Sequence, residues 1–229
     1  MDYIGGNELK KKYMVYGEFY NLKYSDGLEI KCRKLLEIIN KDYVEEINMR
    51  DNLDAVFIMM NPGMSRPLDD NVKQPLVREK DILNNEIVNI PLVEAKPDST
   101  QYQIMRVMEI KRWKHVRIIN LSDIREPKSK IFYDFVRKTD NNLHSIFDKR
   151  RAHELKQCIS NRENKIIAAW GKDKSLDKLI NLAISSELIN ERIGVNSSDD
   201  KKHYSHGSPL LDTQKKQWLR DIIAIINEK

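Results

Sequence analysis

The stretch DAVFIMMNPGMS, from Asp54 to Ser65, decides the fold class. Its first half is an unbroken apolar run of the length of a buried strand, and its second half is a polar turn that contains Asn61, Pro62 and Gly63. In an open α/β sheet, ligands bind just past the carboxyl ends of the parallel strands, where backbone amides and short polar side chains are exposed. The turn after this strand is therefore the first candidate for a binding site.

Three later segments have the same form, in which an apolar run ends in polar residues. They are HVRIINLSD from His115 to Asp123, KIIAAWGK from Lys165 to Lys172, and a loop that reads HYSHGSPL from His203 to Leu210. Helical patterns separate these segments along the chain, and strands that alternate with helices favour a parallel sheet between two helical layers. We therefore expect an α/β protein with a three-layer α/β/α fold and a mainly parallel four-stranded sheet.

The elements between these segments follow from capping residues and apolar periodicity. A weak fourth strand is expected at Arg192 to Val195. Helices are expected after a cap at Asp98 or Ser99, at Phe132 to Arg137, at Ser145 to Ile159, at Ser175 to Leu188, and after a cap at Asp212 or Thr213.

Residues 1–50 are expected to form an N-terminal β extension packed on a core domain of residues 51–229. Lys10 to Tyr24 is rich in aromatic residues and precedes the turn signal Ser25-Asp26-Gly27, so an edge hairpin or strand is expected. Leu28 to Asn40 has loosely helical apolar spacing. Arg66 to Asp98 contains four prolines, and a polar passage of this length is either a functional lid or an insertion without a function. We expect a lid over the Asn61 turn.

Composition sets the class of protein. Charged residues at 33% beside 40% apolar residues are typical of a globular protein, and no apolar run reaches the ~20 residues that cross a bilayer. The N-terminus lacks a signal-peptide core, so the expected location is cytoplasmic, without a membrane partner. The net charge of +5 permits an anionic partner but does not identify one. Oligomeric state is left open.

No cofactor or metal is expected. Cys32 and Cys158 are far apart and have no partner at ligand spacing, so both are interpreted as buried hydrophobic side chains. His203 and His206 stand at i, i+3, but the sequence offers no nearby carboxylate to complete a metal site.

Four motifs, taken in order, resemble those of the uracil-DNA glycosylase superfamily. Met59-Met60-Asn61-Pro62-Gly63 is similar to the Gly-Ile-Asn-Pro-Gly motif of its mismatch-specific branch. Ile119-Asn120 and Trp170-Gly171, at the ends of the next two predicted strands, follow in the order of the superfamily's motifs. His206-Gly207-Ser208-Pro209-Leu210 is similar to the His-Pro-Ser-Pro-Leu motif of the classical branch, so the two ends resemble different branches.

Between Asp54 and Leu211 the chain also resembles the family catalogued as domain of unknown function 1643. The similar segments are FIMMNPG, Asp98-Ser99-Thr100, Lys111-Arg112-Trp113, IINLSDIR and AAWG. The first fifty residues lie outside this resemblance. The family has no settled reaction, so membership would imply a fold and not an activity.

The resemblance to the glycosylases implies a role for each polar strand end. Asn61 would position a water near the sugar carbon, and His206 would donate to the base oxygen as negative charge develops. Asn120 would bind the amide-like edge of a pyrimidine, Tyr102 would stack on the base, and Leu210 would enter the duplex as an apolar wedge. The other expected substrate contacts are Pro62, Gly63, Ser65, Trp170, Gly171 and Ser208.

Each role has a purely structural alternative. The Asn61 segment can be only a turn, Asn120 can cap a helix, Tyr102 can be core, and Trp170 with Gly171 can pack a strand-to-helix corner. The implied function is a cofactor-free protein that binds a nucleobase in DNA or a nucleotide and hydrolyses an N-glycosidic bond.

Two other functions stay open. One is a non-catalytic nucleotide or nucleic-acid binding module with the same pocket. It is favoured by Asn61, which stands where the Gly-Gln-Asp-Pro-Tyr form of the glycosylase motif has an aspartate, and by Gly207 in place of proline, which loosens the His206 loop. The other is a partner-binding protein that uses Arg66 to Asp98 and presents an apolar surface. The deciding prediction is that Asn61, Asn120 and His206 surround one cavity.

Overall fold

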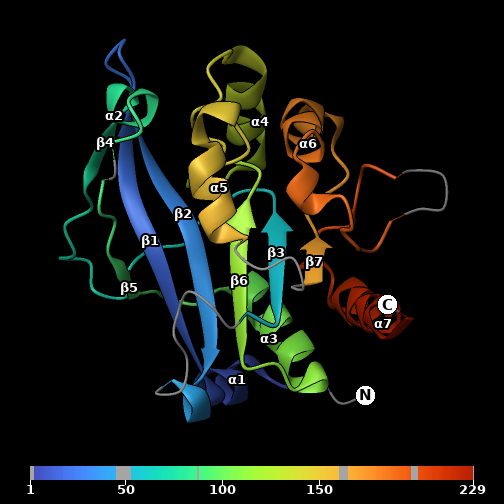
Figure 1. Cartoon of the computed structure of the whole chain (residues 1–229). Coiled ribbons are helices and arrows are strands. Elements are labelled where there is room, and N and C mark those ends of the chain that lie inside the picture. The colour runs from blue at the N-terminus through green and yellow to red at the C-terminus, as the bar shows by residue number, and fades with distance from the viewer. Residues whose placement is uncertain (1–2, 45–52, 87, 160–164, 197–200, 229) are drawn as a thin grey trace.

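The computed structural model describes residues 3–44, 53–86, 88–159, 165–196 and 201–228. Its centre is a mixed seven-stranded sheet with the strand order β4-β1-β2-β6-β3-β7, and β5 also pairs with β1 (Figure 1). The strands are β1 Tyr13–Lys23, β2 Glu29–Asn40, β3 Ala55–Met59, β4 Leu76–Arg78, β5 Leu92–Glu94, β6 His115–Asn120 and β7 Lys165–Ala168.

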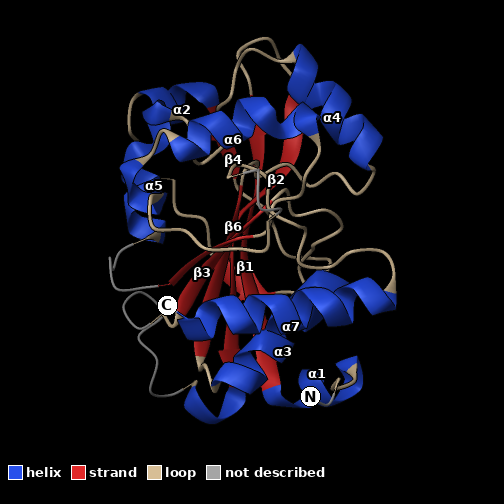
Figure 2. Cartoon of the chain, turned by 90° about the vertical axis from the view of Figure 1, so that its right-hand side faces the viewer, coloured by secondary structure: helices blue, strands red, loops and turns tan. Residues whose placement is uncertain are grey.

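Helices cover both faces of the sheet (Figure 2). One layer contains α1 Gly6–Lys12, α3 Ser99–Lys111 and α7 Asp212–Glu228; the other contains α4 Ser129–Lys138, α5 Ala152–Cys158 and α6 Asp177–Ile184. The short helix α2, Glu79–Leu83, follows β4. The predicted α/β class is thus confirmed, but the sheet is mixed where a mainly parallel sheet was predicted.

The parallel part of the sheet is smaller than predicted. β3 pairs in parallel with β6 and with β7, whereas β2 pairs antiparallel with β6 and with β1. The predicted fourth strand at Arg192 to Val195 is reduced to one parallel bridge between Ile193 and Ile167. The prediction of a mainly parallel four-stranded sheet is therefore wrong, because the N-terminal hairpin joins the sheet and supplies its antiparallel half.

The helix predicted at Leu28 to Asn40 is strand β2. Its second half is buried on both faces, with Leu35 in one core cluster and Leu36 in the other. Burial on both faces removes the alternation that identifies a strand, so consecutive apolar residues resemble a helix. The hairpin turn at Ser25-Asp26-Gly27 is as predicted, but residues 13–40 are central to the sheet and are not an added layer. The proposed boundary at residue 50 lies outside the described residues.

The helix predictions are mostly confirmed. Asp98 caps α3 by accepting the backbone N–H groups of Thr100 and Gln101. The helix expected at Ser145 to Ile159 forms only over its last part, after a 3-10 turn at Lys149–Arg151. Cys32 and Cys158 are buried free thiols. Within the described ranges, the helices are all too short or too polar to span a bilayer.

A buried ionic group fastens β2 to β6. The Glu37 carboxylate contacts Arg117 Nη2 at 2.7 Å through Oε1 and His115 Nε2 at 3.0 Å through Oε2. Arg117 also donates to the carbonyl of Cys158 at 2.9 Å, which ties the pair to α5. All three charged or titratable side chains are almost fully buried, so each needs the others.

Removing the charge of Glu37 should therefore destabilise the protein strongly. We expect Glu37→Gln to lower the free energy of unfolding by about 3–5 kcal/mol, the usual effect of breaking a buried ion pair. Urea denaturation measures this loss. The matched control is Glu8→Gln, which breaks an exposed pair with Lys11 and should change stability by less than about 1 kcal/mol. Equal effects of the two substitutions would contradict a structural role for the Glu37 group.

Candidate functional site

A polar cavity of about 150 Å³ opens at the carboxyl ends of β3 and β6. Asn61, Asn120 and His206 all line it, so the two polar strand ends and the loop that the sequence singled out lie around one space. The other lining residues are Arg33, Met59, Met60, Pro62, Gly63, Asp98, Thr100, Gln101, Ile118, Glu126 and Pro127.

Strand register brings the first two of these side chains together. In the parallel pair, Met59 at the end of β3 lies opposite Asn120 at the end of β6. The N–H of Leu121 donates to the Met59 carbonyl at 2.8 Å, and the N–H of Ser122 donates to the Met60 carbonyl at 3.2 Å. These bonds continue the pairing past both strands, so the Asn61 turn and Asn120 are held on the same edge of the sheet.

The carboxamide of Asn61 has a fixed orientation. Its Nδ2 donates to the carbonyl oxygens of Ile124 at 3.1 Å and Glu126 at 2.8 Å. Both amide hydrogens are thereby used within the chain, so Oδ1 is the group left to accept a hydrogen bond from a ligand or water. Asn61 is therefore an oriented acceptor at the cavity wall as well as part of a turn.

Asn120 is buried without a partner. The side chain is 0% exposed, and neither Nδ2 nor Oδ1 has a hydrogen-bond partner among the described residues. It does not cap a helix, since α4 begins after Lys128. A buried polar group without a hydrogen bond costs about 1–3 kcal/mol, so such groups are uncommon unless they have a function. Asn120 offers one donor and one acceptor side by side.

His206 presents a donor to the same cavity. Its Nδ1 accepts the backbone N–H of Ser208 at 3.1 Å, so in the neutral ring the proton is on Nε2. Burial lowers the pKa of His206 below its usual value, which favours that neutral form.

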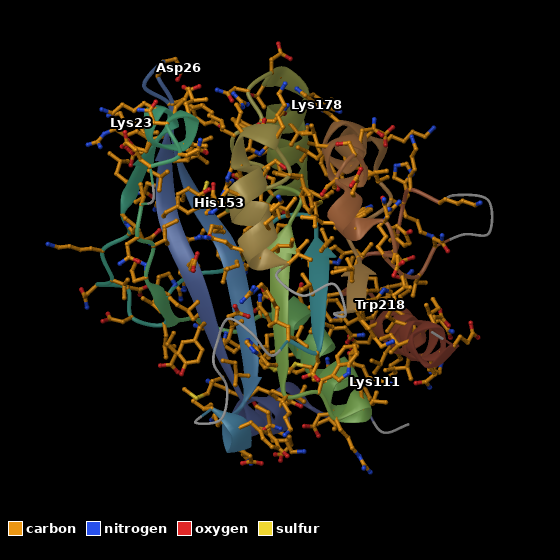
Figure 3. All side chains as sticks on the ribbon, in the orientation of Figure 1. Lys23, Asp26, Lys111, His153, Lys178 and Trp218 are labelled. Carbon is orange, nitrogen blue, oxygen red and sulfur yellow. The ribbon has the colours of Figure 1, made fainter. Side chains whose placement is uncertain are left out.

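The loop that carries His206 is packed tightly. A Cβ at Gly207 would lie 3.3 Å from the ring of Trp218, which projects from α7 (Figure 3), and 3.4 Å from the Met59 side chain. The expectation that Gly207 loosens the loop is therefore wrong: the missing side chain lets the loop approach α7 and the sheet. The N–H of Ser205 also donates to the Val195 carbonyl at 2.6 Å. Residues 197–200, in the same polar loop, lie outside the described residues.

Three residues with predicted roles lie away from the cavity. Tyr102 packs its ring 3.4 Å from the position of a Cβ at Gly6, on the outer side of α3, and does not line the cavity. Trp170 is fully buried; its Nε1 donates to the Lys202 carbonyl, and its ring packs on Tyr204. Gly171 donates its N–H to the Tyr204 carbonyl. These three residues have the structural roles that were the alternatives to ligand contact.

Of the remaining residues predicted to contact the substrate, only some line the cavity. Pro62 and Gly63 line the cavity. Ser65 is buried beside it, where its carbonyl accepts from Arg125 Nε at 2.6 Å. Ser208 contributes its N–H to His206, and Leu210 is 91% exposed on the surface next to the cavity loop.

The segment from Arg66 to Asp98 is not a lid. β4 and β5, both within it, pair with β1 at the far side of the sheet, and only Asp98 at its end lines the cavity. A lid was expected because the segment is long and polar, but its extended pieces instead satisfy the backbone groups of β1.

His203, the other member of the histidine pair, binds Asp177 at 2.7 Å through Nε2. The described residues contain no cluster of three or more metal-ligating side chains.

Sequence reasoning missed Arg33, which reaches the cavity from β2. It was assigned to a helix outside the resemblance, so its position beside β6 could not be seen. No signal in the sequence separates Arg33 from Lys34, which follows it between Cys32 and Leu35. Thr100 and Gln101, in the first turn of α3, were also missed.

Comparison with known proteins adds no information about this site. The chain matches no protein-family model, no curated protein and no solved structure. The function must therefore be argued from the chemistry of the cavity itself.

The protonation state of His206 is open to direct measurement. The unfolded chain should bind this proton near pH 6.5, whereas the native pKa is lower. The stability that neutral His206 contributes is thus fully present above about pH 6.5 and is lost as the pH falls through the native pKa. We expect nitrogen-15 NMR at pH 7 to show the neutral Nε2–H tautomer, with a titration midpoint below 6.5. A midpoint above 6.5 would contradict the partly buried, Ser208-bonded ring.

Proposed function

We propose that this chain is a uracil-DNA-glycosylase-like protein that binds a nucleobase, in DNA or in a nucleotide, and hydrolyses the N-glycosidic bond. The observation that carries the proposal is the fully buried carboxamide of Asn120, which has no partner in the described part of the chain and lines a cavity together with Asn61 and His206. The proposal needs no cofactor. We also propose that the chain belongs to the family named domain of unknown function 1643.

Asn120 matches the edge of a nucleobase. A pyrimidine or purine edge carries adjacent donors and acceptors, and a carboxamide pairs with such an edge through its own donor and acceptor. A ligand that forms both bonds would satisfy two buried atoms that have no partner among the residues the structure describes. Met59 and Ile118 add apolar surface to the cavity, as is usual for pockets that bind flat rings.

Asn61 is suited to positioning a water. Its Oδ1 can accept a hydrogen bond from a water that faces the sugar carbon, and the fixed carboxamide keeps that acceptor in one direction. An amide is not a general base, so we expect slow chemistry. The two carbonyl oxygens that accept from Nδ2 also explain the choice of residue, because a carboxylate in this position would face both of them and be repelled.

His206 would act on the departing base. Negative charge develops on a base oxygen as the glycosidic bond breaks, and a fixed Nε2–H donor stabilises that charge. A neutral imidazole is sufficient for this role. Leu210, exposed next to the same loop, is placed where an apolar side chain could contact a duplex if the substrate is DNA.

The alternative is a non-catalytic module that binds a nucleotide or nucleic acid in the same cavity. It is favoured because both carboxylates at the cavity already accept hydrogen bonds from the backbone. Asp98 accepts two N–H groups, and Glu126 accepts one from Lys128. Carboxylates engaged in this way are weaker candidates for a general base. A partner-binding role for Arg66 to Asp98 required an apolar surface in place of a convergent pocket, and the polar cavity does not match it.

Turnover separates the first two functions. We expect the wild-type protein to release a free base from DNA containing uracil, hypoxanthine or alkylated bases, or from free nucleotides, and Asn61→Ala to lose this activity without unfolding. Chromatography of the released base and circular dichroism measure the two properties. The control is Asn71→Ala, which removes an exposed amide bonded to Asp69 and should leave turnover unchanged. If wild type releases no base from any substrate, the enzymatic proposal fails and only binding can be retained.

The role of Asn120 can be tested through stability. Asn120→Leu replaces two unsatisfied polar atoms by methyl groups of similar shape, so we expect the free energy of unfolding to rise by about 1 kcal/mol. The same change should abolish nucleoside-induced thermal stabilisation. A large loss of stability would instead show that the amide is satisfied in the folded chain and is not held for a ligand.

A further inference from the structure

Arg33 enters the cavity because of a bulge in β2. The β1–β2 register pairs Gly17 with Leu36 and then Phe19 with Arg33, so Glu18 alone opposes both Lys34 and Leu35. Without the extra residue, Arg33 and Leu36 would point to opposite faces, since they are three positions apart. With it, Arg33 lines the cavity on the face that holds Leu36 and Ile118. Bulges commonly redirect a side chain next to a functional site.

The guanidinium of Arg33 is buried and unpaired. The residue is 2% exposed, and neither Nε nor Nη1 has an acceptor among the described residues. Buried charges are normally paired, because desolvation is costly. Burial lowers the pKa of Arg33 to about 10, which still leaves the side chain charged at neutral pH.

The carboxylates near Arg33 are engaged elsewhere. Asp98 accepts the N–H groups of Thr100 and Gln101 at the start of α3. Asp123 accepts from the hydroxyl of Tyr20 at 2.7 Å and pairs with Arg151 at 2.8 Å. Both favour the charged form of Arg33 electrostatically, yet neither forms an ion pair with it in the part of the chain described here.

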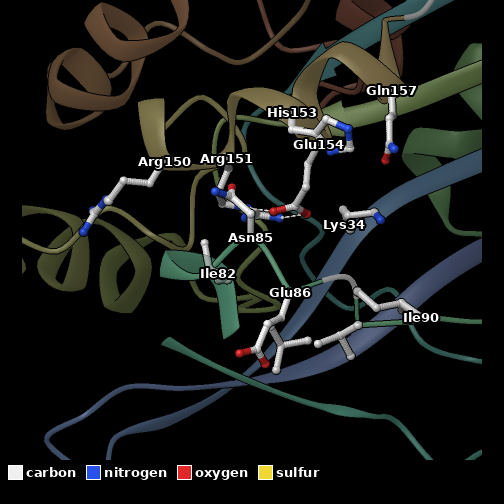
Figure 4. A pocket seen from close by; sticks show the side chains of 12 residues that line it. Lys34, Ile82, Asn85, Glu86, Ile90, Arg150, Arg151, His153, Glu154 and Gln157 are labelled. Atoms are coloured by element: carbon white, nitrogen blue, oxygen red, sulfur yellow. Dashed lines mark hydrogen bonds and ion pairs between the residues drawn. The ribbon is translucent and has the colours of Figure 1, made fainter. Parts of the chain in front are cut away.

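A second cavity, of about 90 Å³ on the other face of the sheet, shows the usual arrangement (Figure 4). Its cationic residues have carboxylate partners: Arg151 pairs with Glu154 at 2.9 Å, Arg150 with Asp148 at 2.7 Å, and Lys34 with Glu18 at 2.6 Å. Lys34 and Arg33 are neighbours in the chain, on opposite faces of the bulge. Of these two, Arg33 is the one without a counterion in the described part of the chain.

We propose that the ligand of the Asn120 cavity carries an ionised oxyanion group, a carboxylate or a phosphate, that binds the guanidinium of Arg33. A guanidinium donates to the two oxygens of such a group through Nε with Nη2 or through Nη1 with Nη2, so one bidentate contact would satisfy one of the two unpaired nitrogens of Arg33. The inference rests on the proposed function for the identity of the base, and it narrows the ligand to an anionic nucleobase or nucleotide.

The sheet also places the anionic group relative to the base. Arg33 lies on β2 and Asn120 on the adjacent strand β6, and neighbouring strands are about 4.8 Å apart. Asn61 follows β3, one strand further in the same direction. Asn120 therefore ends the strand between β2, which carries Arg33, and β3, which leads to Asn61.

Calorimetric titration with matched neutral and anionic ligands tests the inference. The pairs are uracil with uracil 6-carboxylate and uridine with uridine 5′-monophosphate, and inorganic phosphate is included alone. We expect wild type to bind at least one anionic member at least tenfold more tightly than its neutral partner, and the pair that shows the effect identifies carboxylate or phosphate. Arg33→Gln should reduce that ratio to about one, whereas the control Lys34→Gln should retain it.

The outcomes separate the two proposals. Equal binding of neutral and anionic partners by wild type, or an unchanged ratio in Arg33→Gln, would overturn the role of Arg33. Binding of inorganic phosphate that depends on Arg33, with no added affinity from any base, would support the anion site and overturn the nucleobase proposal. Should Arg33→Gln fail to fold, Arg33→Lys keeps the charge without the planar fork and should lower the ratio by at least threefold; an unchanged ratio there would count against the inference.

Discussion

The parallel pairing of β3 with β6 is the constraint on which the rest of the structure depends. It places Met59 opposite Asn120 and makes both strands end at one edge of the sheet. Two backbone bonds continue the pairing into the loops that follow, which sets Asn61 beside the cavity. α3 and the His206 loop then close the space from the same face, through the Asp98 cap and the contact of Gly207 with Trp218. The polar groups of the cavity are thus positioned by the rigid part of the fold.

Two large polar side chains at the cavity differ from the ionic groups elsewhere in the core. Glu37, His115 and Arg117 satisfy one another, and Asp123 is paired with Arg151 and Tyr20. Asn120 and Arg33 are equally buried and have no such partners among the described residues. Leaving a buried guanidinium and a buried carboxamide without hydrogen-bond partners gains nothing in stability. These two side chains are the basis of the proposed ligand site.

The sequence predicted those features that depend on local signals. The apolar run before Asn61, the cap at Asp98 and the amphipathic stripe of α6 were all recognised, and the expected meeting of Asn61, Asn120 and His206 is present. β2 was missed because burial on both faces removes its alternation. Arg33 was missed with it, since a bulge that depends on pairing with β1 leaves no local trace. Tyr102 was placed in the site by resemblance alone, and its ring packs on α1.

A crystal structure of the chain with bound uridine 5′-monophosphate tests the central claim most directly. The account predicts that the base lies in the cavity at the ends of β3 and β6, with its edge within hydrogen-bond distance of both Asn120 Nδ2 and Oδ1. A nucleotide bound elsewhere on the surface, with the Asn120 carboxamide still without a partner, would contradict it.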